Sequence, residues 1–125
     1  MYGNHTHNHF LLSSLNTKQQ NFQIDKCHQF LTENIPVKSI SKIFSIPFGG
    51  EQSISATTMK RLSVYGYKAA LMSRSRINLR QNMFKKKLHN LPIFERFMPV
   101  NELTLFKKQF LGLKVRSLYN LIKSI

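Results

Sequence analysis

Apolar residues in this chain recur mainly at intervals of three and four, and proline or glycine separates the groups. This spacing is typical of one face of a short α-helix. In residues 25–34 it predicts a helix that buries Cys27, Phe30 and Leu31. Pro36 marks the end of this helix, because proline cannot donate a backbone hydrogen bond.

Little regular structure is predicted around that first helix. Residues 1–23 hold one apolar cluster in a stretch rich in Asn, His and Ser, and we expect mostly loop. Residues 35–57 alternate between apolar and polar positions only in part, and Pro47 and the pair Gly49–Gly50 interrupt them. Since both residue types favour turns, we expect extended chain or loop here.

Four helices are predicted in the second half, because apolar residues return at helical spacing after several capping residues. A Phe-rich stretch between Pro92 and Pro99 is predicted to be a linker. The first helix runs from Met59 towards Met72 and is capped by Thr57–Thr58, and the second begins at Ser73 or Ser75 and ends at Leu88. The third begins at Asn101 and places Leu103, Phe106 and Phe110 on one face. The apolar face of the fourth consists of Val115, Leu118, Ile122 and Ile125.

Charge narrows the class of function more than the helices do. The 125 residues include 19 Lys or Arg and 5 Asp or Glu, a formal net charge of +14. This excess favours a polyanionic partner, either nucleic acid or an acidic membrane surface. The charge is concentrated in residues 60–89, which contain nine basic residues and no acidic one.

Catalysis, metal binding and cofactors are not predicted. The few carboxylates are scattered, no nucleophile motif is present, and Gly49–Gly50 lacks the Lys-Ser/Thr that completes a phosphate loop. His5, His7 and His9 would share one face of an extended strand, with Cys27–His28 downstream, but this is not the usual spacing of zinc ligands. We therefore expect no enzyme, no metal, no cofactor and no small-molecule substrate.

The basic segment favours nucleic acid over membrane. On a helix, Arg76, Arg80 and Lys87 lie near one face, whereas Asn78 and Gln81 interrupt the apolar face that a membrane-surface helix requires. The sequence contains no zinc-finger spacing, leucine zipper or RNA-recognition aromatic motif. Short helices with long extensions suit a protein that reads the shape and phosphates of folded RNA.

The stretch Thr57–Ser75, TTMKRLSVYGYKAALMSRS, resembles bacterial-type large-subunit ribosomal protein thirty-four. That family's pattern has Lys-Arg, three residues, His-Gly-Phe, Arg-Ala, and then Met and Thr-Lys at spaced positions. In this chain the matching positions, in order, are Lys60–Arg61, Tyr65–Gly66–Tyr67, Lys68–Ala69, Leu71 and Ser73–Arg74. The frame departs from the family at Arg76, where the family has glycine, and the resemblance covers about 30 residues.

The resemblance implies a pair of short helices, arranged like a helix-turn-helix, inside large-subunit ribosomal RNA. Gly66 would allow close approach of the backbone to RNA, and Tyr65 and Tyr67 would stack on bases or pack between the helices. The implied RNA-binding residues are Lys60, Arg61, Tyr65, Gly66, Tyr67, Lys68, Arg74, Arg76, Arg80, Lys85, Lys86 and Lys87.

Together these features predict a mainly α, non-globular protein with three parts. Residues 1–56 form an N-terminal extension, residues 57–89 a helical RNA-binding core, and residues 90–125 a helical extension that contacts neighbouring ribosomal proteins. We expect a structural constituent of the mitochondrial large ribosomal subunit, located in the matrix. The alternatives are another mitochondrial ribosomal protein, lineage-specific or of the small subunit, and a basic accessory subunit of a mitochondrial membrane complex.

Overall fold

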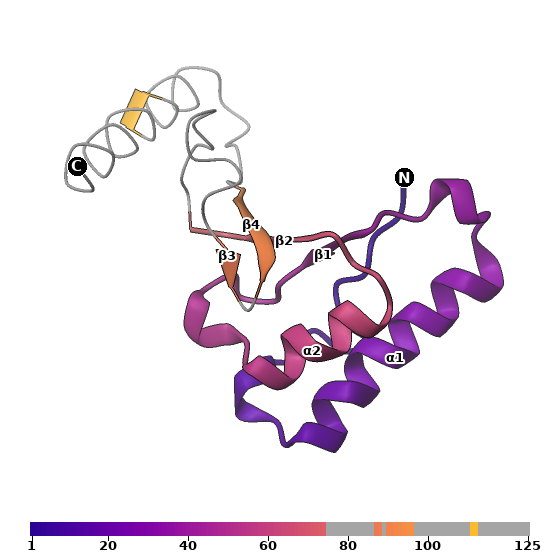
Figure 1. The fold of residues 1–125 in the computed structure, drawn as a ribbon, viewed down its shortest axis with the longest axis horizontal. Helices are drawn as coiled ribbons and strands as arrows, with labels where there is room; N and C mark the ends of the chain where they lie inside the picture. The colour runs from indigo at the N-terminus through magenta and orange to yellow at the C-terminus, as the bar shows by residue number, and fades with distance from the viewer. Residues whose placement is uncertain (75–86, 89, 97–110, 113–125) are drawn as a thin grey trace.

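A computed structural model describes residues 1–74, 87–88, 90–96 and 111–112 of the chain. Within these ranges the chain forms a helix, a strand, a second helix and then three strands (Figure 1). The helices are α1 (Thr17–Asn34) and α2 (Ala56–Val64), and the strands are β1 (Ile43–Ser45), β2 (Ala69–Met72), β3 (Lys87–Leu88) and β4 (Leu91–Glu95).

The four strands form one mixed sheet in the order β1-β2-β4-β3. β1, β2 and β4 are parallel, and β3 pairs antiparallel with β4. Ala70 lies at the centre, opposite Phe44 of β1 and Ile93 of β4. The segment β1–α2–β2 is therefore a βαβ unit, in which a helix connects two adjacent parallel strands.

The N-terminal residues extend this sheet beyond β1. Tyr2 forms a parallel bridge with Ile40, and the Ser45 amide donates to the Asn4 carbonyl at 3.0 Å. The Asn4 side chain is fully buried and donates to the Ile24 carbonyl of α1 at 3.0 Å. The first residues are thus tied to both the sheet and a helix.

Both helices begin at a capping box, and the cap of α2 is Ser55 instead of the expected Thr57–Thr58. The Asn16 side chain accepts from the Gln19 amide, and the Gln19 side chain accepts from the Asn16 amide. Ser55 and Thr58 make the same reciprocal pair at the start of α2. Such pairs satisfy backbone donors that a helix N-terminus leaves free.

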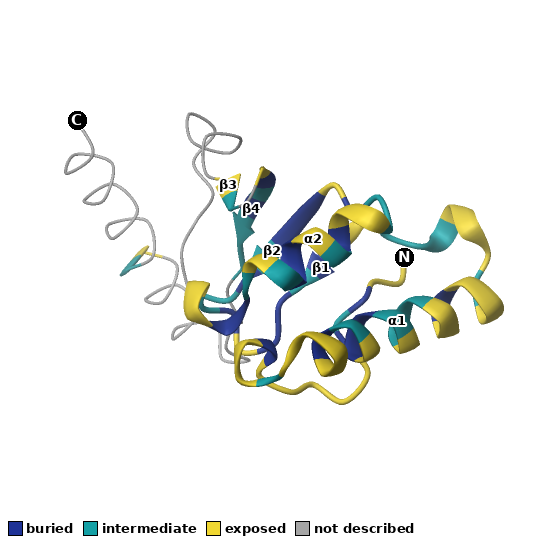
Figure 2. Ribbon diagram, turned by 60° about the horizontal axis from the view of Figure 1, so that its bottom comes forward, coloured by how far each residue is buried: buried dark blue, intermediate teal, exposed yellow. Residues whose placement is uncertain are grey.

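The core lies between the sheet and the two helices, which pack side by side on one face of the strands (Figures 1 and 2). The buried apolar cluster draws on widely separated parts of the sequence. Its members are Leu12, Ile24, Phe44, Ile46, Ile54, Met59, Leu62, Tyr67, Ala70, Met72, Leu91 and Ile93.

The prediction of a mainly α protein with a helix-turn-helix core is wrong, because the chain has an α/β fold. The helix expected from Met59 to Met72 ends at Val64, and Ala69–Met72 form the central strand β2. Three of the four residues of β2 are buried and Leu71 is partly buried, so the strand is a continuous apolar run without alternation. Such a short run cannot be distinguished from buried helix by periodicity.

Two further helix predictions change in the structure. The helix predicted over residues 25–34 begins earlier, at Thr17, and it buries Leu31 but leaves Phe30 60% exposed. Lys87–Leu88, expected at the end of a helix, form β3, and part of the predicted linker forms β4. The third and fourth predicted helices fall mainly on residues outside the described ranges.

Candidate nucleic-acid interface

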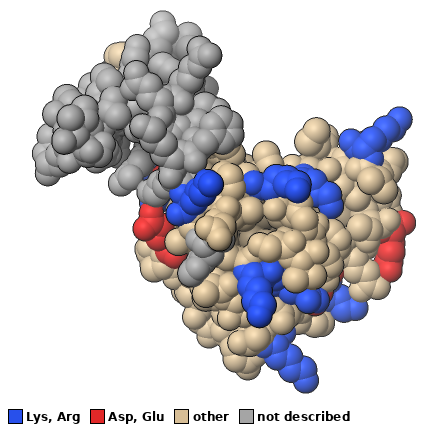
Figure 3. Space-filling model, in the orientation of Figure 1, with Lys and Arg blue, Asp and Glu red and all other residues tan. Residues whose placement is uncertain are grey.

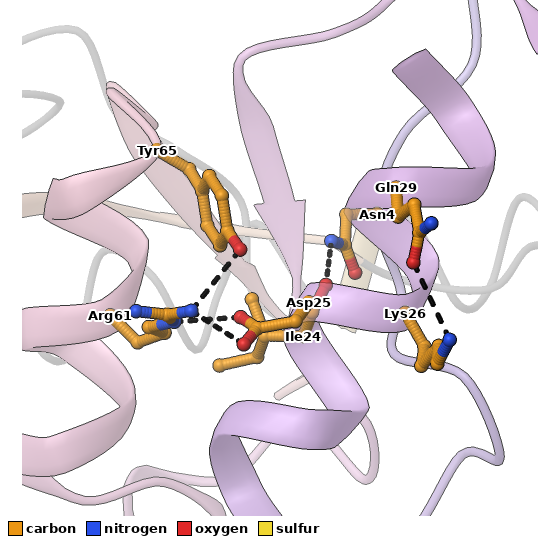
Figure 4. A network of polar contacts seen from close by, with 7 residues as sticks. All are labelled: Asn4, Ile24, Asp25, Lys26, Gln29, Arg61 and Tyr65. Atoms are coloured by element: carbon orange, nitrogen blue, oxygen red, sulfur yellow. Dashed lines mark hydrogen bonds and ion pairs between the residues drawn. The ribbon is translucent and has the colours of Figure 1, made fainter. Parts of the chain in front are cut away.

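Arg61, one of the predicted RNA-binding residues, joins the two helices (Figure 4). Its guanidinium donates from Nε to Asp25 Oδ1 at 2.6 Å and from Nη2 to Asp25 Oδ2 at 2.5 Å. Nη2 also donates to the Tyr65 hydroxyl at 3.2 Å. The hydrogen bond to Asp25 raises the pKa of Arg61, so the guanidinium stays charged in this pair. A two-point contact of this kind fixes the relative orientation of α1 and α2.

Tyr65 is half-buried, and its ring has two close neighbours. Its ring stacks on His28 with 3.9 Å between centroids, and the Arg61 guanidinium lies 5.0 Å from the ring centre. Lys42 donates to the Tyr65 carbonyl at 3.4 Å. Tyr65 therefore packs against α1, which agrees with packing between helices, the alternative to base stacking for this residue.

Gly66 ends α2, with φ of +68°. The Gly66 amide donates to the Ser63 carbonyl and the Tyr67 amide donates to the Leu62 carbonyl, both across the helix end. This pattern is a Schellman motif, which places glycine at the left-handed position and an apolar contact beside it. Tyr67 and Leu62 supply that contact, since they are 3% and 0% exposed.

Tyr67 packs in the core, which was the alternative to base stacking for this residue. Its hydroxyl shares a 3.2 Å hydrogen bond with His28 Nδ1, and burial raises the pKa of Tyr67 to about 12. Burial is the largest cause that lowers the pKa of His28, and the charge of Lys42 is the second. The charge of Asp25 acts in the opposite direction and raises this pKa. Tyr67 and His28 thus extend the polar contacts between α1 and α2 into the core.

Arg74 joins three elements at the carboxyl end of β2. It forms ion pairs with Glu51, in the turn before α2, and with Glu95 at the end of β4. Its Nε donates to Glu95 Oε2 at 3.0 Å, and its side chain is only 17% exposed. The Arg74 guanidinium is therefore occupied by ion pairs with residues of the same fold.

The remaining predicted residues divide into exposed lysines and positions outside the described ranges. Lys60, Lys68 and Lys87 are exposed, and no lysine of the described part takes part in an ion pair there. Figure 3 shows basic side chains spread over the visible face and acidic ones mostly near its margins. Arg76, Arg80, Lys85 and Lys86 lie outside the described residues.

The histidine series does not converge as an extended strand would allow. The rings of His5 and His9 lie 4.6 Å apart, whereas His7 contacts Phe22 with its ring edge. Burial is the main cause that lowers the pKa of His5, whose Nδ1 lies 2.8 Å from the Ser45 carbonyl. Among the described residues no cluster of His, Cys, Asp or Glu has an arrangement that would hold a metal ion.

Several residues that build this region were not identified from the sequence. Asp25 and Glu95 were treated as scattered acids, yet they bind Arg61 and Arg74. Gln20 is 5% exposed and accepts hydrogen bonds from Ser55 and Thr58 at 2.7 and 2.9 Å, which joins the start of α1 to the cap of α2. No periodicity signals these pairs, because they depend on how the helices pack.

Comparisons with protein-family models, with curated proteins and with solved structures find no match to this chain. Among the described residues, neither helix combines the length and the hydropathy that crossing a membrane requires. The class that fold and surface define is therefore a small basic α/β protein, and its function is a matter of proposal.

Proposed function

We propose that this chain is a non-catalytic nucleic-acid-binding protein and that its ligand is RNA. The observation that carries the proposal is how the fold uses its charges. Asp25, Glu51 and Glu95 are three of the five acidic residues in the chain, and all three form ion pairs with Arg61 or Arg74. The lysines of the described residues are exposed and form no ion pair among these residues, which favours a partner that supplies many negative charges.

Phosphates of a nucleic acid fit this surface better than a lipid headgroup layer does. A membrane-surface helix needs one broad apolar face beside its basic face. The exposed positions of α1 include Phe22 and Phe30, but Lys26 lies between them and Lys18 and Glu33 lie beside them, so they form no broad apolar face. RNA is preferred over duplex DNA because the ribosomal resemblance implies it.

The most specific form of the proposal comes from the ribosomal resemblance. It makes the chain a structural constituent of the mitochondrial large ribosomal subunit, with ribosomal RNA and neighbouring proteins as partners. Residues 57–74 form a helix and a strand instead of the implied helix pair. This form is therefore supported by the matched residues and by the charge, and not by the fold.

Equilibrium binding separates the ligand classes. Fluorescence anisotropy would compare a structured RNA, a single-stranded RNA and a duplex DNA of equal phosphate number, each over a range of salt concentrations. We expect tighter binding to RNA and a logarithm of affinity that falls linearly with the logarithm of salt. A preference for duplex DNA would overturn the assignment to RNA. Binding to anionic vesicles but to none of the nucleic acids would overturn the whole proposal.

Sedimentation of a gentle mitochondrial lysate tests the ribosomal form. Co-migration with the large subunit that ribonuclease abolishes would support it, and co-migration with the small subunit would remove the family assignment. Arg76→Glu combined with Arg80→Glu should prevent incorporation, whereas Phe106→Ala should only weaken it. Normal incorporation of the double variant would overturn the role of the basic segment.

A further inference from the structure

A pocket of about 370 Å³ lies beside the first turns of α1. The phenyl rings of Phe10 and Phe22 line it, together with Leu15. The two phenylalanines are 49% and 47% exposed. Nearly half-exposed aromatic rings grouped in one pocket leave a contiguous apolar surface in water, which is typical of a binding site.

Hydrogen bonds hold the residues that form the pocket wall. The His7 amide donates to the Gln23 carbonyl at 3.0 Å, and the Asn8 amide donates to Gln23 Oε1 at 2.8 Å. The His7 ring contacts the Phe22 ring edge-on, with 6.0 Å between centroids. The chain before α1 is thus fixed against the helix, so the pocket exists before any ligand arrives.

The polar part of the lining suits an aromatic heterocycle. Gln19 and Gln23 both line the pocket, and their side-chain oxygens already accept from backbone amides. Their NH₂ groups therefore carry the remaining hydrogen-bonding capacity, and an amide donor matches the ring nitrogens and carbonyl oxygens of a nucleobase. The volume is at the lower end of the roughly 300–1,000 Å³ range of ligand pockets, which suits one nucleotide-sized group.

Charge points to the same ligand. Lys18 lines the pocket, and no acidic residue does. An apolar pocket whose lining contains a cation and no anion fits a ring that is attached to a phosphate better than it fits a neutral apolar segment. Single-stranded nucleic acids are bound in this way, by aromatic stacking of bases beside basic residues.

We propose that this pocket receives one unpaired base of a single-stranded nucleic acid, which stacks on Phe22 and Phe10 while Lys18 contacts an adjacent phosphate. The proposal rests on the proposed function, since it names a subsite of nucleic-acid binding. It adds a contact that depends on the base and not on charge alone. The exposed lysines would contribute affinity that is independent of the base.

The test compares Phe22→Ala with Phe30→Ala, a matched control. Phe30 is on the same helix and is 60% exposed, but it does not line the pocket. The probe is a short single-stranded RNA with 2-aminopurine at one position, and a second strand lacks that base while keeping its phosphate. The full chain is used, and circular dichroism melting verifies that each variant is folded.

We expect Phe22→Ala to weaken binding of the base-bearing strand by about 5- to 150-fold, the range of one stacked base. Phe30→Ala should leave it unchanged, and Phe22→Trp should restore both affinity and 2-aminopurine quenching. The strand that lacks the base should bind wild type and Phe22→Ala equally. The salt dependence should be the same for all variants, because no phosphate contact is lost.

Three outcomes would overturn the pocket assignment and leave the proposed function intact. These are equal losses for Phe22→Ala and Phe30→Ala, no loss for Phe22→Ala, and equal wild-type affinity for the strands with and without the base. In any of these cases the pocket takes another occupant, such as an apolar peptide. If wild type binds neither strand nor any structured RNA, the proposed function itself fails, and the pocket proposal fails with it.

Discussion

Arg61 binds Asp25 through two hydrogen bonds of 2.6 and 2.5 Å, across 36 positions of sequence. The pair joins α2 to α1, and its side chains are about one-third exposed. Arg61 matches the Lys-Arg pair of the ribosomal resemblance and was predicted to contact RNA. In this fold its charge is already neutralised, so its first role is to orient one helix against the other.

Removal of the Asp25 carboxylate should therefore destabilise the fold. Asp25→Asn keeps the shape of the side chain but leaves the Arg61 guanidinium without its counter-charge. We expect a loss of about 1 kcal/mol in the free energy of unfolding, since the pair is partly exposed. Urea denaturation measures this as a lower midpoint at constant slope. Glu33→Gln, on the exposed surface of the same helix, is the control and should change the midpoint little.

Gly66 should matter for stability through its backbone conformation. Its φ is +68°, and a Cβ atom at this position would have no neighbour within 4 Å. Gly66→Ala should therefore destabilise the protein by about 1 kcal/mol, the cost of a left-handed conformation in an L-residue. Gly3→Ala serves as the control, because there a Cβ would make ordinary contacts only.

The same glycine variant separates structural from RNA-binding roles. If Gly66 acts only as the helix end, Gly66→Ala lowers the thermal midpoint but leaves RNA affinity unchanged at a temperature where the protein is folded. A loss of affinity without a loss of stability would instead show that the RNA backbone approaches this residue.

Stability should decrease as the solution is acidified. The pKa values of His5 and His28 are both lowered in the folded state, mainly by burial. The unfolded chain, in which histidine has a pKa of about 6.5, therefore takes up protons first. Unfolding becomes easier as the pH falls below about 6.5, and this loss levels off below the folded-state values.

Urea unfolding at a series of pH values between 7.5 and about 5 measures this dependence. His28→Gln should reduce the slope of stability against pH. The slopes should be compared, and not the absolute stabilities, because this variant also loses the stacking contact with Tyr65. The exposed His7→Gln should keep the wild-type slope. An unchanged slope in His28→Gln would contradict the role of its burial.

The sequence predicted the polar and turn-forming features better than the strands. Pro36 follows the end of the first helix as expected, and residues 35–55 contain β1 and short helical turns in addition to loop, whereas α2 begins at Ala56. The start of α1 carries a capping box, Asn16 with Gln19, that could have been identified. β2 could not be, because a buried central strand has the same apolar sequence as a buried helix turn.

The candidate site was predictable in its charge but not in its geometry. The excess of lysine over acidic residues can be counted in the sequence, and lysine is expected at the surface because its ammonium group is strongly hydrated. Which arginines are neutralised depends on contacts between residues that are 21 to 36 positions apart. From the sequence, Arg61 and Arg74 were therefore expected to bind RNA in the same way as Lys60 and Lys68. In the structure the two arginines form ion pairs, whereas the two lysines form none among the described residues.

That difference gives the last prediction, which concerns RNA binding. Lys60 and Lys68 are exposed and take part in no ion pair within the described residues. Lys60→Gln combined with Lys68→Gln should weaken binding and lower the salt slope by about 1.4 on a single strand, since each lost phosphate contact contributes about 0.7. Lys26→Gln combined with Lys38→Gln removes the same charge from exposed positions outside the basic segment and should leave most of the slope intact. Equal slopes for the two double variants would mean that the basic segment is not the contact surface.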